Sequence, residues 1–132
     1  MDNKSEAPYN LNHFQPVTLG NKIYVLEAFF VGGFPNQSNS DTVLIYDTTS
    51  DTWQRGAIMP KERSRASAGA AAYAGKLYLV AGIQHGQSSG TTIMFDVNDT
   101  QINKWTALAD APYIRVHCAA AIGKDKLYIT VA

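Results

Sequence analysis

Short apolar segments recur along the chain, and three of them share one pattern. They are GNKIYV from Gly20, AGKLYLVAG from Ala74 and KDKLYITVA from Lys124. In each segment a lysine and an aliphatic residue precede a tyrosine, and Tyr24, Tyr78 and Tyr128 lie 54 and then 50 residues apart. Self-similarity at a period near 50 residues is typical of repeat architectures. The sequence therefore predicts three copies of one structural unit.

Within each copy, the apolar and polar positions follow the pattern of β-strands. TVLIYD from Thr42 and TTIMFD from Thr91 alternate apolar and polar residues, and KLYLVAG from Lys76 is short, apolar and rich in residues that favour strands. Turns are expected at TTSD from Thr48 and at VNDTQIN from Val97. No segment of the sequence keeps a 3.6-residue period. The pattern predicts four strands in each copy and an all-β fold.

One stretch, SAGAAAYAG at 67–75, has the alanine content of a helix. Its counterpart at 13–20 contains Pro16 and Val17, and a proline inside a helix costs about 3 kcal/mol. Because the copies should share one conformation, we predict a strand in both places. The small residues there and at 118–121 indicate a crowded position, at which alanine and glycine avoid overpacking.

A unit of about 50 residues with four strands is typical of a blade of a β-propeller. The alanine-rich strands are then the innermost ones, with a free edge that tolerates Pro16. We expect a repeat region over 1–132, with a first blade over 9–59, a second over 60–111 and the start of a third over 112–132. About two and a half blades do not close a ring, which typically has four to eight. The remaining blades are expected from a longer chain or from oligomerisation.

The order of residues within the copies resembles the kelch motif, which is found in propellers such as the central domain of galactose oxidase. The recurring features are the Gly-Lys-Leu-Tyr segment, an aromatic residue followed by aspartate at Tyr46-Asp47 and Phe95-Asp96, and a tryptophan at Trp53 and Trp105. The resemblance covers nearly the whole chain and implies an incomplete kelch-type β-propeller of four-stranded antiparallel sheets. Both tryptophans are expected to begin outer strands and to pack between neighbouring blades.

The glycine doublet of a kelch repeat is altered in every copy. The second copy has Ala81-Gly82 and the third ends in Val131-Ala132. In the first copy, the doublet position is held by Glu27-Ala28 if the strand is uninterrupted, or by Gly32-Gly33 if five residues are inserted. We favour the first alternative, which leaves a long loop over 29–40.

In kelch propellers, the loops after the doublet and the loops that lead into the innermost strand lie on one face, the ligand-binding face of the family. In this sequence those loops carry aromatic, amide and cationic side chains, which suit sugars or acidic peptides. The candidate ligand-binding residues are Phe34, Asn36, Arg65, His85, Tyr113 and Arg115, together with His13 and His117.

Spacing relates several of these candidates to one another. Arg65 and Arg115 each precede the repeat tyrosine by thirteen residues, and they either bind a ligand or bond carbonyls of a neighbouring loop. His13, Ser67 and His117 each precede it by eleven residues. These three are expected to form an arc around the mouth of the central channel, either as ligand-binding groups or as a solvated lining.

Charge and composition disfavour several classes of function. Eleven lysines and arginines balance eleven aspartates and glutamates, so the chain lacks the positive field that nucleic-acid or anionic-membrane binding needs. No apolar run has the length of a bilayer span or of a signal peptide. Similarity to secreted microbial kelch proteins allows an extracellular location, and the single cysteine does not decide the compartment.

We expect no metal and no other cofactor. A metal site needs three or four converging ligands, and the repeat between His13 and His117 offers only Ser67 at the matching position. His117 and Cys118 are neighbours on a strand, so their side chains face opposite sides and cannot form a nucleophile and base pair. Cys118 is predicted to lie in the core.

The sequence contains no catalytic constellation. It therefore favours a non-catalytic kelch-repeat module that binds a carbohydrate or protein partner through loops on one propeller face. The alternative is a part of a carbohydrate-active enzyme, similar to galactose oxidase or to a sugar epimerase, whose catalytic residues lie in the remaining blades.

Overall fold

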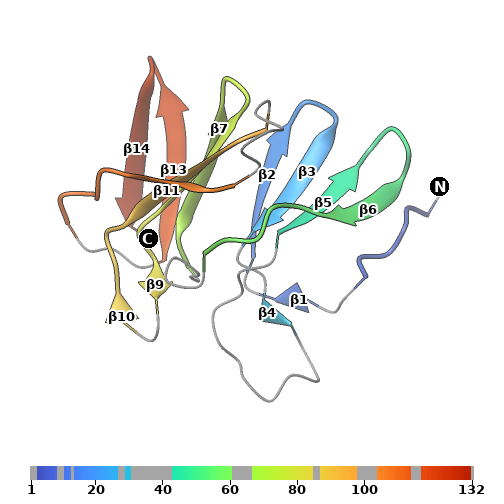
Figure 1. Cartoon of the computed structure of the whole chain (residues 1–132), viewed down its shortest axis with the longest axis horizontal. Coiled ribbons are helices and arrows are strands. Elements are labelled where there is room, and N and C mark those ends of the chain that lie inside the picture. Colours follow the sequence, from blue (N-terminus) through green and yellow to red (C-terminus); the bar gives the residue numbers. More distant parts are fainter. Residues whose placement is uncertain are drawn as a thin grey trace.

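The computed structural model describes residues 3–8, 11–12, 14–26, 29–30, 43–60, 67–84, 87–97, 104–113 and 117–131. These ranges consist of β-strands joined by turns and irregular segments, without a helix (Figure 1). None of them therefore contains a helix able to cross a bilayer. The predicted all-β class is confirmed.

Most strands belong to two four-stranded antiparallel sheets and one hairpin, called here sheets 1, 2 and 3. Sheet 1 contains, in spatial order, β2 (Gln15–Leu19), β3 (Lys22–Leu26), β5 (Leu44–Asp47) and β6 (Thr52–Arg55). Sheet 2 contains β7 (Gly69–Tyr73), β8 (Lys76–Val80), β11 (Thr92–Asp96) and β12 (Thr106–Leu108). Sheet 3 contains β13 (Cys118–Gly123) and β14 (Lys126–Val131). Sheets 1 and 2 have the order and pairing of propeller blades, as predicted.

The register of the two four-stranded sheets repeats residue for residue. The repeat lysine faces the aspartate of the aromatic-aspartate pair in both, as Lys22 opposite Asp47 and Lys76 opposite Asp96. The alanine-rich stretch forms β7, where propensity alone would give a helix, because its residues pair with β8 along their whole length. The strand that the repeat predicted at this position is therefore confirmed.

The innermost strands β2, β7 and β13 stand side by side (Figure 1). A Cβ atom added to Gly69 in β7 would lie 2.9 Å from the Cβ of Ala120 in β13, closer than real Cβ contacts come. Small residues are therefore required where β7 and β13 meet, as the sequence indicated. β2 is an edge strand of sheet 1, where the missing backbone N–H of Pro16 disrupts no central ladder.

The main hydrophobic core lies between sheets 1 and 2. Its largest fully buried side chains are Leu26, Met59, Leu77, Leu79 and Ile93. Burial of each such side chain contributes about 1.5–3 kcal/mol. Trp105 joins this cluster just before β12: its ring centroid lies 5.6 Å from that of Phe95, and its Nε1 donates a 3.0 Å hydrogen bond to the Ala57 carbonyl. Trp105 thus packs between two blades, as expected.

Trp53 packs on the opposite side of sheet 1. Its ring lies 5.1 Å from that of Tyr46, between centroids, and its Nε1 donates a 3.1 Å hydrogen bond to the carbonyl of Ser5. Ser5 is held in turn by Asp51, whose carboxylate accepts hydrogen bonds from the Ser5 amide at 2.8 Å and from the Tyr46 hydroxyl at 2.6 Å. Trp53 is the second residue of β6, so the prediction that it begins the strand is off by one position.

Two short ladders lie outside the blades. β4 (Phe29–Phe30) pairs with β1 (Leu11–Asn12), so the predicted loop over 29–40 begins with a strand, and its remaining residues lie outside the described ranges. β9 (Ile83–Gln84) pairs with β10 (Gln87–Ser88) in the segment that follows the Ala81-Gly82 doublet. Two-residue strands have no periodicity, which is why the sequence pattern did not reveal them.

Candidate functional site

The starts of the three innermost strands surround a cavity. Its volume is about 260 Å³, and it is lined by Phe14, Gln15, Ser67, His117 and Cys118. These residues come from three repeats, and they meet because β7 contacts both β2 and β13. Two of the three positions predicted to form an arc, Ser67 and His117, thus share one cavity. The third, His13, lies outside the described residues.

Ser67 and His117 also share an unusual backbone conformation. Their φ angles are 58° and 51°, in the left-handed region that residues other than glycine rarely adopt. The carbonyl of Ser67 accepts a 3.3 Å hydrogen bond from the amide of Cys118, which ties the second repeat to the third at this point. The equal spacing from the repeat tyrosine therefore corresponds to a similar bend at the entrance of β7 and of β13.

The neighbours His117 and Cys118 have different environments. The His117 residue is exposed, whereas Cys118 is buried and packs with Val80 and Ala81. Cys118 forms no disulfide, and its predicted place in a hydrophobic cluster is confirmed. The cavity therefore offers an exposed imidazole, a hydroxyl, an amide and the half-exposed ring of Phe14 to a ligand.

Tyr113 is a predicted site residue that does not reach this cavity. It is 67% exposed and lines a different, mostly apolar hollow of about 270 Å³. The other lining residues of that hollow are Ala111, Pro112, Leu127, Tyr128 and Ile129. Tyr113 and His117 thus line different cavities.

Six predicted site residues lie outside the described ranges. They are His13, Phe34, Asn36, Arg65, His85 and Arg115. Their convergence on one face stays a prediction from the repeat spacing. Within the described ranges, histidine, cysteine, aspartate and glutamate side chains form no group of three able to hold a metal ion.

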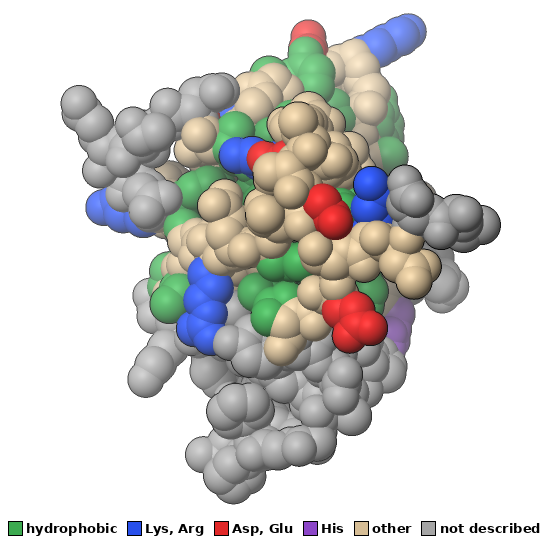
Figure 2. Space-filling model, turned by 90° about the vertical axis from the view of Figure 1, so that its right-hand side faces the viewer, with side chains coloured by type: hydrophobic (Ala, Val, Ile, Leu, Met, Phe, Trp, Pro, Cys, Tyr) green, Lys and Arg blue, Asp and Glu red, His purple; other side chains and the backbone are tan. Residues whose placement is uncertain are grey.

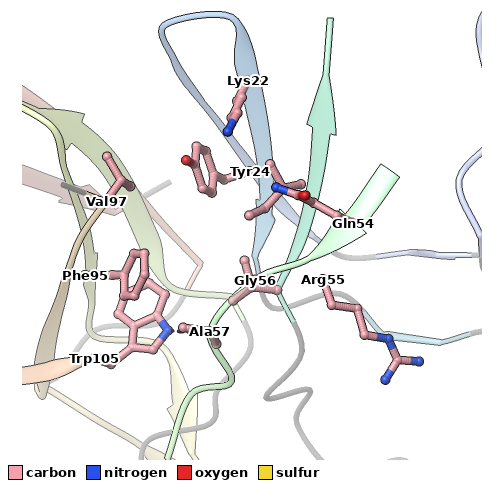
Figure 3. A pocket seen from close by; sticks show the side chains of 11 residues that line it. Lys22, Tyr24, Gln54, Arg55, Gly56, Ala57, Phe95, Val97 and Trp105 are labelled. Carbon is pink, nitrogen blue, oxygen red and sulfur yellow. Dashed lines mark hydrogen bonds between the residues drawn. The ribbon is translucent and has the colours of Figure 1, made fainter. Parts of the chain in front are cut away.

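A third cavity was missed by the sequence reasoning. It is a cleft of about 280 Å³ between sheets 1 and 2, with Tyr24, Phe95 and Trp105 among its lining residues (Figure 3). Burial raises the pKa of the Tyr24 hydroxyl above its ordinary value, so this phenol is neutral at physiological pH. No sequence signal distinguishes Tyr24 from the other repeat tyrosines, because the cleft forms only when two repeats pack together.

The charged groups are mixed on the surface. On the face shown in Figure 2, lysine and arginine side chains lie among aspartates and glutamates, with hydrophobic side chains visible between them. The described part of this face shows no large area of one sign, in keeping with the balanced charge of the sequence.

Comparison with known proteins gives two matches. Residues 11–60 and 64–112 each match the Kelch motif family, and together they cover most of the chain. The chain is also 32% identical over 104 residues to the mouse protein described as Kelch-like protein 35. That alignment covers 78% of this chain but only 17% of the mouse protein.

Proposed function

Because this chain belongs to the kelch-repeat family, we propose that it is a non-catalytic binding module for a protein partner. The partner binds at the end of the blades where the innermost strands begin. The cavity formed there by Phe14, Gln15, Ser67 and His117 carries this proposal. It unites side chains from all three repeats, so it is a property of the assembled propeller rather than of one blade.

The chemistry of the cavity supports recognition of a peptide segment. An exposed aromatic ring supplies contact area, and the imidazole, hydroxyl and amide donate and accept hydrogen bonds. Cys118 is buried against Val80 and Ala81, so its thiol is poorly placed to act as a nucleophile beside His117. These features favour binding over catalysis.

A carbohydrate is the second candidate ligand. The same hydroxyl, amide and imidazole groups bind sugar hydroxyls, and Phe14, at 41% exposure, offers a ring face for stacking. The alternative of a carbohydrate-active enzyme requires catalytic groups outside the described residues. Arg65 and Arg115 precede Ser67 and His117 by two residues in the sequence and stay candidate ligand contacts.

Arrays of peptides and of glycans, probed with the full-length protein, identify the class of ligand. We expect His117→Ala and Phe14→Ala to weaken binding of the selected ligand by about tenfold each, the effect of losing one hydrogen bond or one ring contact. The control is Lys124→Ala, an exposed change in the β13–β14 turn at the opposite end of the strand. Unchanged affinity in both cavity variants would exclude this end of the blades as the binding surface.

A further inference from the structure

The cleft between sheets 1 and 2 has the composition of a separate ligand site. One wall comes from β3, β5, β6 and the segment after β6, and the other comes from β11, Val97 and Trp105 (Figure 3). Its lining residues include Lys22, Tyr24, Gln54, Phe95, Val97 and Trp105. None of the lining residues belongs to the cavity proposed above for the partner.

Tyr24 provides the first observation that points to a ligand. The residue is only 5% exposed, and its hydroxyl is directed into the cleft (Figure 3). Among the residues that the structure describes, no hydrogen bond is made by this hydroxyl, and burial alone raises its pKa. Buried side-chain hydroxyls are nearly always hydrogen-bonded, so a group inside the cleft must supply the partner.

Lys22 provides the charge. It lies two residues before Tyr24 on β3, so both side chains are on the same face of the sheet and meet at one end of the cleft (Figure 3). Asp47, opposite Lys22 in the register, accepts hydrogen bonds from the amides of Ser50 and Thr49 at 3.1 and 2.9 Å, which lower the pKa of its carboxyl, and the charge of the nearby Lys22 lowers it further by a smaller amount. No described lining residue is acidic. The ammonium group therefore favours an anion beside the Tyr24 hydroxyl.

The other end of the cleft is aromatic. The rings of Phe95 and Trp105 lie 5.6 Å apart between centroids, and the indole Nε1 is occupied by its bond to the Ala57 carbonyl. These two side chains therefore offer apolar surface, with the amide of Gln54 across from them. The volume of about 280 Å³ is near the lower limit of small-molecule pockets, which start at about 300 Å³.

We propose that this cleft binds a small carboxylate with a flat apolar body. The carboxylate accepts hydrogen bonds from the Lys22 ammonium and the Tyr24 hydroxyl, and the flat body packs against Phe95 and Trp105. The cation sets the charge of the ligand, and the size of the cleft limits it to about one ring.

Benzoate is the probe, and isothermal titration with the full-length protein is the measurement. A ligand of this size is expected to bind with a dissociation constant of about 1 mM. We expect Tyr24→Phe and Lys22→Gln each to weaken benzoate binding by about tenfold, because each removes one hydrogen bond to a charged group. The neutral analogue benzamide should bind at least tenfold more weakly than benzoate to the unchanged protein.

The next repeat supplies matched controls. Tyr78 and Lys76 hold the same strand positions in sheet 2 and do not line this cleft. Tyr78→Phe and Lys76→Gln should leave benzoate affinity unchanged, and thermal melting of all four variants separates loss of binding from loss of folding. The side chain of Lys22 is partly exposed, so Lys22→Gln should not disturb folding. This variant therefore still tests the proposal if Tyr24→Phe proves unstable.

Three results would overturn the proposal. One is equal binding of benzamide and benzoate, which would remove the role of charge. Another is that the sheet 1 variants, Tyr24→Phe and Lys22→Gln, weaken benzoate binding no more than the sheet 2 controls do, which would mean that benzoate binds outside this cleft. The last is a crystal soaked in benzoate that has only an ordered water on the Tyr24 hydroxyl. None of these results depends on the partner-binding cavity.

Discussion

The repeat tyrosine holds the same strand position three times and has three different environments. Tyr24 is 5% exposed, Tyr78 is half-buried and Tyr128 is 55% exposed. The difference arises from the neighbouring sheet: sheet 2 covers Tyr24, whereas no described strand covers Tyr128. A single residue type at one repeat position therefore serves as a cleft lining in one copy and as exposed surface in another.

Substitution of Gly69 tests whether the close approach of the innermost strands β7 and β13 is needed for stability. Gly69→Ala would bring a Cβ to 2.9 Å from the Cβ of Ala120 and to 3.3 Å from the backbone of Ala119. We expect a loss of about 1–3 kcal/mol in the free energy of unfolding, the usual effect of overpacking. Denaturant midpoints of the full-length protein measure it.

The matched control is Gly123→Ala in the neighbouring repeat. A Cβ there meets only the ring edge of Tyr128, at 3.8 Å, which is an ordinary contact. This variant should be nearly neutral. Equal destabilisation by both changes would mean that loss of glycine itself, rather than crowding at the axis, is responsible.

At the scale of elements, the two tryptophans differ in what covers them. Trp105 is 5% exposed between two sheets, while Trp53 is only partly buried against Val25 and Leu44. We expect Trp105→Ala to lower the free energy of unfolding by about 3–5 kcal/mol and Trp53→Ala to lower it by less. Chemical denaturation with tyrosine fluorescence or circular dichroism decides the order. A larger loss for Trp53 would contradict this packing.

The blades could be predicted from the sequence, because each of their strands has a counterpart one repeat away. The strand at Gly69–Tyr73 was recognised only through its proline-containing counterpart, against its own helix propensity. The ladder of Ile83–Gln84 with Gln87–Ser88 was not predicted, since such short strands depend on pairing partners rather than on pattern.

The candidate sites were predictable to different degrees. The meeting of Ser67 and His117 followed from their equal distance to the repeat tyrosine. The cleft at Tyr24 was not foreseen, because it depends on how Phe95 and Trp105 of the next repeat pack against sheet 1. The spacing of the repeats identifies residues at equivalent positions in different blades. It does not give the angle at which two blades pack, and the cleft between them depends on that angle.

At the scale of the whole molecule, large hydrophobic side chains are exposed on sheet 3 and on the described segments before it. Tyr113 and Tyr128 are 67% and 55% exposed, and Leu108 is 37% exposed. In sheets 1 and 2 the strand corresponding to β14 has neighbours on both sides, whereas β14 pairs only with β13 among the described strands. An open strand edge beside exposed aromatic side chains promotes association.

We therefore expect the isolated 132-residue chain to self-associate in water. Analytical ultracentrifugation over a range of concentrations measures this. Discrete trimers would indicate that copies close a ring together, while larger, polydisperse species would indicate unspecific association of the open edges. A monodisperse monomer with a cooperative thermal transition would contradict the prediction.

Each tryptophan hydrogen bond joins a blade to the chain that precedes it. The pairs are Trp53 with the Ser5 carbonyl and Trp105 with the Ala57 carbonyl. In both, donor and acceptor are 48 residues apart, so residues 3–8 have the same place beside sheet 1 that residues 55–60 have beside sheet 2. Proline recurs at the end of this segment, at Pro8, Pro60 and Pro112.

When one repeat is moved into another propeller, the position of the cut decides whether this hydrogen bond is kept. A segment cut to begin after Pro60 would contain Trp105 but leave behind the carbonyl of Ala57 to which its indole donates. A graft that begins at Arg55 would take both partners of the bond with it. The unit that can be transferred intact therefore does not coincide with one sheet. It consists of one blade and the last residues of the preceding blade.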